Sequence, residues 1–287
     1  MNIFSFFQFK PIFTLIIVAA LLVLAKPDEV SAQGINPDCI GSANVFDNSQ
    51  LDGGNDCLRE PKFYGIEMFE IAMCRSAPAV PTTTSTINLI DCDIIFSSAV
   101  GSQIQVKVGE STNVPGTARR PDNGIYTHAY ILLSNRFRIR HSQQMSRITT
   151  ADIGSGIFCF TLTKTVSSAD DTPDRSQCAA TAPTEAQIGT ITDVIDDFDT
   201  NLFSFTDGVI TAYITNNAGL LLGSGEQAQA SKLIGVQPFA TPIVITENSS
   251  VINIAFKVSR GMTVEFDNTD RLEIFGSGPF SVSISVR

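Results

Sequence analysis

The sequence predicts an all-β protein: an antiparallel β-sandwich of one large or two fused units, with one or two short helices and disulfide staples. Three observations support this fold class: segments of alternating hydrophobicity, six cysteines that form three pairs of similar spacing, and an N-terminus typical of export. Alternation of apolar and polar residues buries one face of a strand and leaves the other in water, as antiparallel sheets require.

The alternation is clearest late in the chain. Ile252, Ile254, Phe256 and Val258 recur at every second position, and the last segment alternates apolar residues with serines up to Arg287. Earlier, the turn sequence Pro121-Asp122-Asn123-Gly124 precedes one long strand expected over residues 126–140.

Two short segments favour helix instead. Thr184-Glu185-Ala186-Gln187 resembles a capping box, and Ile188, Ile191, Ile195 and Phe198 follow at helical spacing. A second short helix is expected around residues 227–233.

Residues 1–32 have the features of a signal peptide. Lys10 provides the positive charge, residues 11–25 form an apolar run, and Val30-Ser31-Ala32 provides small residues for cleavage. The run is shorter than the roughly 20 residues that a spanning helix needs. We therefore expect residues 33–287 to form the β-sandwich region of a protein that is secreted, on the cell surface or in the periplasm, with no membrane contact after cleavage. A lapse in the pattern suggests sub-units 33–148 and 149–287.

All six cysteines lie beyond this peptide, and an even number in an exported chain indicates disulfides. Six cysteines allow 15 pairings. Neighbours along the chain are 18, 18 and 19 residues apart, which favours three local loops. The predicted bonds are Cys39–Cys57, Cys74–Cys92 and Cys159–Cys178.

Charge argues against a nucleic-acid-binding protein and we expect no nucleic-acid partner, because an isoelectric point near 4.6 gives no general basic footprint. The charge is uneven: residues 33–150 carry net −1 and residues 151–287 carry net −9. Arg136, Arg138 and Arg140 form a row in the less acidic half. The row is either the solvated face of one strand or an interface that meets an acidic neighbour.

Metal-binding and catalytic patterns are weak. Asp197, Asp199 and Asn201 match the first ligand positions of a calcium loop, but Leu202 stands where that loop needs glycine. They remain weak candidates, and we expect no metal and no cofactor. The two histidines, His128 and His141, are not in a metal-spaced cluster, and the Gly-x-Ser-x-Gly pattern of many hydrolases is absent. We expect no catalytic residue and no enzyme, although a hydrolase with a dispersed site is a third option.

Several short segments resemble uncharacterised exported bacterial proteins with β-sandwich folds, and more distantly the transthyretin-like sandwich modules of surface proteins. The resemblance implies a sandwich over most of residues 33–287 and no transferable activity. The segments are Phe63-Tyr64-Gly65-Ile66-Glu67, Cys74, Cys92, Gly124-Ile125-Tyr126-Thr127-His128, Pro242-Ile243-Val244-Ile245, Ile252-Asn253-Ile254-Ala255-Phe256 and Pro279-Phe280-Ser281-Val282.

These observations favour a non-enzymatic extracellular structural or surface protein, such as a filament, coat or adhesin-like subunit. Its partner would be another copy of the chain or another surface protein. The alternative is a secreted or periplasmic ligand-binding protein that could depend on calcium. The terminal strand has no Lys or Pro to blunt an edge, so Phe280, Val282 and Ile284 join the arginine row as interface candidates.

Overall fold

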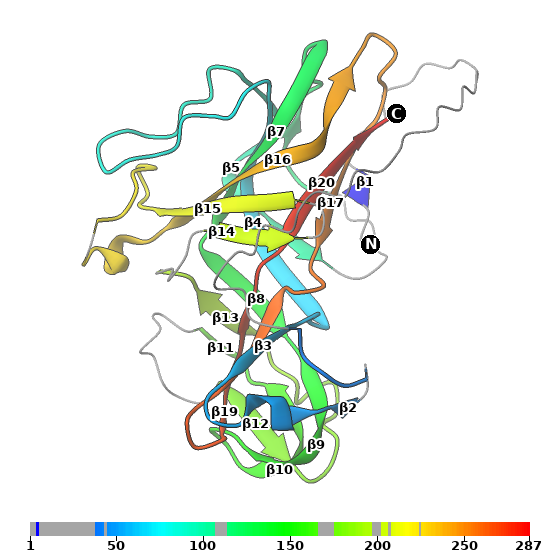
Figure 1. Cartoon of the computed structure of the whole chain (residues 1–287), viewed down its shortest axis with the longest axis vertical. Helices are drawn as coiled ribbons and strands as arrows, with labels where there is room; N and C mark the ends of the chain where they lie inside the picture. Colours follow the sequence, from blue (N-terminus) through cyan, green and yellow to red (C-terminus); the bar gives the residue numbers. More distant parts are fainter. Residues whose placement is uncertain are drawn as a thin grey trace.

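The chain folds as an all-β protein with several antiparallel sheets, as the alternation predicts (Figure 1). A computed structural model describes residues 4–5, 38–42, 45–106, 114–165, 175–196, 202–205, 208–223 and 225–287. The helices in these ranges are two short 3-10 turns, η1 (Asn48–Leu51) and η2 (Gln227–Gln229). None of the described helices is long and apolar enough to cross a bilayer.

The largest sheet has the order β11-β13-β8-β4-β7-β16-β15-β14, and β5 and β6 continue from β4. The long strand β4 lies at its centre because it pairs with β5, β7 and β8. The strands of this sheet are β4 (Phe63–Cys74), β5 (Cys92–Val106), β6 (Thr117–Ala118), β7 (Gly124–Ser134), β8 (Arg136–Arg140), β11 (Lys164–Thr165), β13 (Ile191–Val194), β14 (Leu202–Phe205), β15 (Gly208–Thr215) and β16 (Lys232–Ile245).

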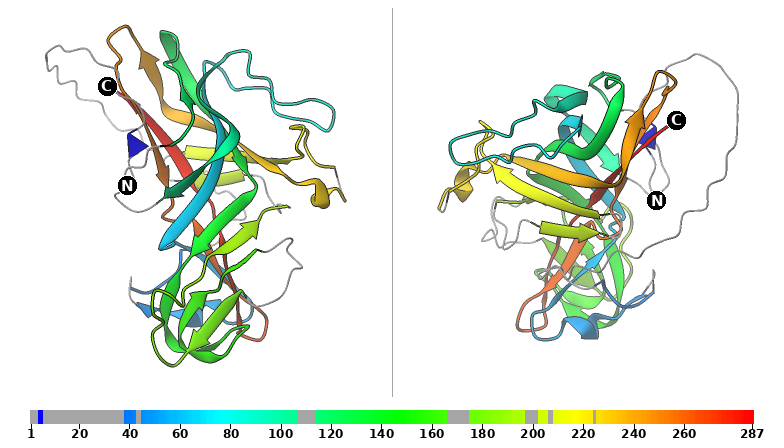
Figure 2. Two further views of the ribbon diagram at one scale, coloured as in Figure 1. Left: turned by 180° about the vertical axis from the view of Figure 1, so that it is seen from behind. Right: turned by 45° about the horizontal axis from the view of Figure 1, so that its top comes forward.

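Three smaller sheets complete the described fold. Strands β17 and β20 cross beside the large sheet in its upper half, whereas β9, β10 and β12 form the lower end of the molecule (Figures 1 and 2). Strand β19 packs against β8, β10 and β12, so the lower half has two layers. Their orders are β1-β17-β20, β12-β10-β9-β2 and β19-β18-β3. Their strands are β1 (Phe4–Ser5), β2 (Val45–Phe46), β3 (Asp56–Arg59), β9 (Ser142–Thr150), β10 (Ser155–Thr161), β12 (Ser176–Ala179), β17 (Ile252–Lys257), β18 (Met262–Phe266), β19 (Leu272–Ser277) and β20 (Ser281–Val286).

One hydrophobic core joins the sheets. Tyr64, Phe137 and Phe280 stand together within it, with ring centroids 5.8 to 6.2 Å apart, and Phe256 packs on Phe280. Tyr64 lies on β4, Phe137 on β8 and Phe256 on β17, and Phe280 directly precedes β20. The aromatic cluster therefore fixes the small β17–β20 sheet on the large one.

The three predicted disulfides are confirmed: Cys39–Cys57, Cys74–Cys92 and Cys159–Cys178. Two of them join directly opposed residues of antiparallel neighbours, β4 with β5 and β10 with β12. Each therefore closes a local loop across a strand pair, and the described cysteines include no free thiol. Such staples are typical of proteins that fold in an oxidising extracellular environment.

The predicted helix after Thr184 is wrong. The Gln187 side chain accepts hydrogen bonds from the Thr184 backbone N–H and hydroxyl, but only a turn follows, and Ile191 pairs with Ile139 as part of β13. A Cβ at Gly189 would lie 2.0 Å from the Thr163 nitrogen. The glycine thus lets two segments approach closely, and sheet pairing wins over the local helical pattern.

Two other elements differ from expectation. The helix expected over residues 227–233 is only the turn η2, because β16 begins at Lys232 and pairs with β7 and β15. The long strand expected over residues 126–140 is two strands, β7 and β8. It breaks at the buried Asn135, whose backbone and side chain bond Ser231 and Ile195 instead.

Two boundaries remain predictions. The division into sub-units 33–148 and 149–287 falls inside β9, and strands from both sides pair in the large sheet. Phe4–Ser5, within the expected signal peptide, pairs with Ile254 and Asn253 of β17.

Candidate functional site

The arginine row lies on one face of β8, whose other face buries Phe137 and Ile139. Arg140 is engaged within the chain, because it bonds the Glu185 carboxylate at 2.6 Å and the Ile188 carbonyl at 3.1 Å. Arg136 is exposed. The members of the row therefore differ: Arg140 is paired within the chain, whereas Arg136 is exposed to water.

Arg138, the middle member of this row, is more unusual. It stacks over the Phe63 ring, and its Nη2 is buried without a hydrogen-bond partner in the described part of the chain. A buried donor without a partner costs stability, and an added acceptor would relieve that cost.

The apolar interface candidates of the C-terminal strand are core residues. Phe280, Val282 and Ile284 are at most 9% exposed, and their side chains pack inward. What this strand offers to a partner is consequently its backbone edge.

The hydrogen-bonding pattern shows which backbone groups point to that edge. Arg287 and Val251 exchange both backbone hydrogen bonds at 3.0 Å, which fixes the alternation along the pair β17–β20. The N–H and C=O groups of Val282, Ile284 and Val286 therefore point away from β17. The Gln237 side chain bonds both groups of Val282, and no described strand pairs with this edge.

The calcium candidates Asp197, Asp199 and Asn201 lie outside the described residues. Asp193, earlier in the same acidic stretch, accepts hydrogen bonds from the backbone and hydroxyl of Ser277 at 2.7 and 2.6 Å. The described residues contain no group of three or more side chains that could hold a metal ion.

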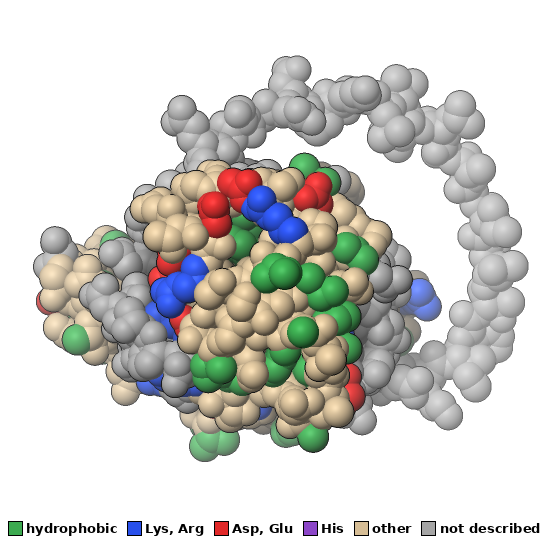
Figure 3. Space-filling view, turned by 90° about the horizontal axis from the view of Figure 1, so that it is seen from below, with side chains coloured by type: hydrophobic (Ala, Val, Ile, Leu, Met, Phe, Trp, Pro, Cys, Tyr) green, Lys and Arg blue, Asp and Glu red, His purple; other side chains and the backbone are tan. Residues whose placement is uncertain are grey.

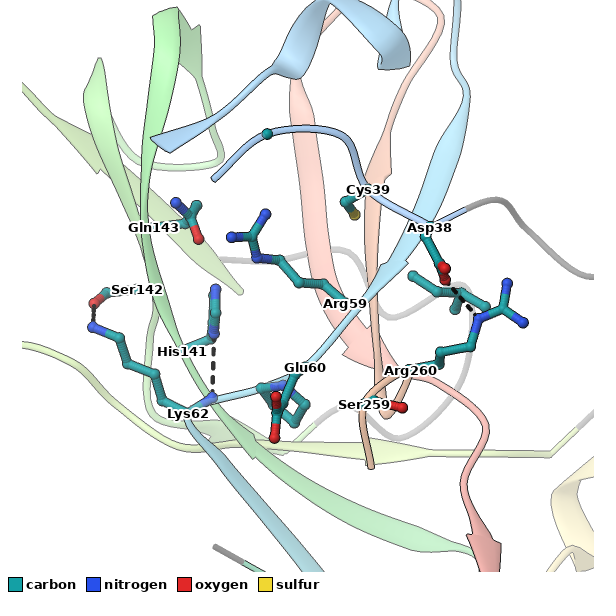
Figure 4. A pocket seen from close by; sticks show the side chains of 13 residues that line it. Asp38, Cys39, Arg59, Glu60, Lys62, His141, Ser142, Gln143, Ser259 and Arg260 are labelled. Carbon is teal, nitrogen blue, oxygen red and sulfur yellow. Dashed lines mark hydrogen bonds and ion pairs between the residues drawn. The ribbon is translucent and has the colours of Figure 1, made fainter. Parts of the chain in front are cut away.

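A polar pocket of about 580 Å³ opens in the lower half of the molecule (Figure 4). Four segments far apart in sequence form its walls: the chain before β2, the β3–β4 connection, the β8–β9 corner and the loop between β17 and β18. The lining residues are Asp38, Cys39, Gly41, Leu58, Arg59, Glu60, Pro61, Lys62, His141, Ser142, Gln143, Ser259 and Arg260.

Local structure holds these side chains in place. The Cys39–Cys57 disulfide ties the N-terminal wall to β3. The tight corner between β8 and β9 places His141, Ser142 and Gln143 in succession beside the Pro61 segment. Ion pairing of Arg260 with Asp38 at 2.7 Å closes the far side of the pocket.

His141 forms a buried part of the wall. Its ring packs on Phe275, and its Nδ1 accepts the Lys62 backbone N–H at 3.3 Å. Burial, followed by the positive charges of Arg59 and Lys62, lowers the pKa of His141 to about 3. A hydrogen bond with the Gln143 side chain opposes this lowering. The imidazole is therefore neutral at physiological pH.

The Lys62 ammonium contacts the Ser142 hydroxyl at 2.6 Å. A serine–lysine pair can act as nucleophile and base when the lysine is desolvated. Lys62 is exposed, so the pair lacks the desolvation that this chemistry requires.

Of the three residues Arg59, Lys62 and His141 in this pocket, the sequence pattern drew attention to His141 alone. The short run Arg59-Glu60-Pro61-Lys62 has no recognisable pattern, because its partners come from three other segments. The predicted Cys39–Cys57 bond is the one sequence feature that points to the pocket, since it brings the segment around Cys39 beside β3.

The lower end of the molecule carries a band of hydrophobic side chains, with charged groups toward its rim (Figure 3). Ile148 of β9 and Ile153 of the following turn are exposed, 73% and 39% respectively. Beside them, Arg147 forms an ion pair with Asp52. Exposed apolar patches are common at interaction surfaces.

Comparison of the chain with protein-family models, curated protein sequences and solved structures finds no match in any of the three. The case for a function therefore rests on the geometry described above.

Proposed function

We propose that the chain is a non-enzymatic structural or surface protein, exported and then assembled with copies of itself or with another surface protein. The disulfides and the all-β fold support an extracellular setting. The resemblance to exported sandwich proteins and transthyretin-like surface modules fits the same role.

The open edge of β20 carries this proposal. The outward backbone groups of Ile284 and Val286 have no hydrogen-bond partner in the described part of the chain. An edge strand without Lys, Pro or a covering strand is a template for β-augmentation. Main-chain hydrogen bonds from an incoming strand would complete the edge beyond the point where Gln237 blocks it.

A second edge becomes relevant if the signal peptide is removed. In the full chain Phe4–Ser5 pairs with the other edge of β17. Cleavage near Ala32 would take this pairing away and expose the backbone groups of Ile254. The mature sheet would then consist of β17 and β20, with the β17 edge and the part of the β20 edge beyond Val282 available.

Charge supports a head-to-tail arrangement. The arginine row of β8 is a local concentration of positive charge on a protein whose net charge is −10. Arg136 is exposed, and the unpartnered Nη2 of Arg138 lies beside it in the row. An acidic surface on the next subunit would complement the exposed Arg136, and heterologous contacts of this kind build rings or filaments.

A pair of variants at one position tests the edge. Val286→Pro removes the outward N–H and blocks an incoming strand, whereas Val286→Ala removes the same side chain and keeps the N–H. Sedimentation velocity should show assembly for the Ala variant and a folded monomer for the Pro variant. If both variants assemble as the parent does, association does not use the β20 edge.

The pocket favours a second candidate, a secreted or periplasmic ligand-binding protein. Its volume is within the range of small-molecule sites. Dependence on calcium would involve Asp197, Asp199 and Asn201 and is tested by thermal shift with and without the ion.

A further inference from the structure

We infer that the pocket bounded by Arg59, Lys62 and His141 binds a small molecule through a compact oxyanion, namely a carboxylate, sulfate or phosphate group. This site is separate from the β20 edge and would serve either of the proposed roles. Three features of the pocket point to an anion: a guanidinium without a counter-ion, a buried imidazole N–H in the wall beside it, and acidic neighbours that are already engaged or turned away.

The guanidinium of Arg59 is the first feature. It is half-buried, stacks over Phe46 and makes one hydrogen bond, from Nη2 to the Ser42 carbonyl at 2.7 Å. No described carboxylate pairs with it, so desolvation lowers its pKa without a compensating charge. A desolvated guanidinium with unused donors is the preferred partner of carboxylate, sulfate and phosphate groups.

His141 is the second feature. The ring is 3% exposed, and because Nδ1 accepts a backbone hydrogen bond, the proton of the neutral ring is assigned to Nε2. The Gln143 side chain is a hydrogen-bond partner of the ring on this side, so a bound oxyanion would share the N–H with it. Arg59 and Lys62 both lie close enough to act on the ring electrostatically. An oxyanion between these groups would balance the two charges and add acceptors to a donor-rich wall.

The acidic residues of the pocket do not fill that role. Asp38 pairs with Arg260 at 2.7 Å on the far side. The Glu60 carboxylate points away from the Arg59 guanidinium, as the close view shows (Figure 4). Arg59 and Lys62 thus face the pocket with an excess of positive charge on a protein whose net charge is −10.

The size and lining of the pocket indicate more than a bare ion. A volume of about 580 Å³ suits a small organic ligand. Ser142, Gln143 and Ser259 provide further polar groups, and the described lining has no aromatic platform. A polar, hydroxylated body that carries one oxyanion matches these walls.

The two histidines provide the test, because NMR can follow their ring protons separately. Inorganic phosphate, sulfate and succinate are added to the full chain in turn, with ionic strength held constant by sodium chloride. We expect a saturable change in the His141 signal and none in that of His128, which lies on β7. The most effective of the three anions identifies the type of oxyanion that the site takes.

Three variants complete the test. Arg59→Gln should weaken binding about 10- to 100-fold, the usual worth of a charge-assisted hydrogen bond. Lys62→Gln, at an exposed position that tolerates change, should weaken it several-fold. Arg119→Gln removes one exposed charge outside the pocket and should leave binding unchanged.

A response that sodium chloride alone reproduces, or an affinity in both Arg59→Gln and Lys62→Gln that equals the parent's, would overturn the inference. The titration is repeated in Val286→Pro, so that failure of assembly and failure of anion binding are scored separately.

Discussion

The side-chain amide of Gln237 hydrogen-bonds both backbone groups of Val282, donating to its carbonyl at 2.9 Å and accepting from its N–H at 3.1 Å. Gln237 is buried on β16, and Val282 belongs to the outer edge of β20. One side chain therefore takes the place of a neighbouring strand and joins the small sheet to the large one.

Replacing Gln237 with Leu should destabilise the protein by about 2–4 kcal/mol, because two buried backbone groups would lose their partners. Urea denaturation measures the change. Gln103→Leu is the matched control, since Gln103 is exposed on β5, and it should stay within about 0.5 kcal/mol of the parent. Equal stability of the Gln237 and Gln103 variants would show that the amide is not a structural link.

Loss of the Cys159–Cys178 bond should also be costly. The two cysteines face each other across β10 and β12, and replacing both with Ala should reduce the free energy of unfolding by about 2–5 kcal/mol. Peptide mapping without reduction checks the pairing itself. A crossed bond such as Cys57–Cys74 would contradict the three local loops.

The sequence predicted features that depend on local pattern. Period-two alternation located β17 and β20. The spacings of 18, 18 and 19 residues located the disulfides, because a bond across neighbouring strands closes a short loop. The helix after Thr184 failed for the opposite reason. Its capping signal is real, but Ile191 gains a strand partner in Ile139, and Gly189 weakens the helix.

The pocket could not be predicted in this way. Arg59 and His141 are separated by about eighty residues, and they meet only because β3, β8 and β9 converge. Likewise, alternation could place Val282 on a buried face but could not reveal that Gln237 blocks its outward backbone groups. Such contacts depend on tertiary packing.

His141 should make the protein less stable in acid. Its pKa is about 3 in the folded chain, against an ordinary value of 6.5 for histidine, so the unfolded chain binds a proton that the folded chain excludes. Stability is then complete above pH 6.5 and declines as the pH falls towards 3. NMR titration of the ring should show a neutral imidazole at pH 5, and a midpoint near 6.5 in the folded protein would contradict its burial.

Glu265 should make the protein less stable as the pH rises, which is opposite to the effect of His141. Burial and the nearby negative charges of Asp193, Asp56 and Glu273 raise the pKa of Glu265 to about 7, although Thr263 donates a hydrogen bond to it. The folded chain holds a proton that the unfolded chain releases from about pH 4.5, so this group lowers stability as the pH rises towards 7.

The variant Glu265→Gln removes that ionisation. It should be more stable than the parent at pH 8 and little different at pH 4, as measured by urea denaturation. The exposed Glu60→Gln is the control, and a similar gain in that variant would assign the effect to general charge repulsion.

The central claim is that the chain associates through its β20 edge and complementary charges. Sedimentation velocity on the mature chain, from Gln33 onward, tests it most directly when run as a concentration series at low and high salt. We predict growth in mass with concentration, reduced by high salt and by charge reversal at Arg136 and Arg138. A monomer at every concentration and salt level, together with no polymer on native cells, would contradict the claim and favour the ligand-binding role.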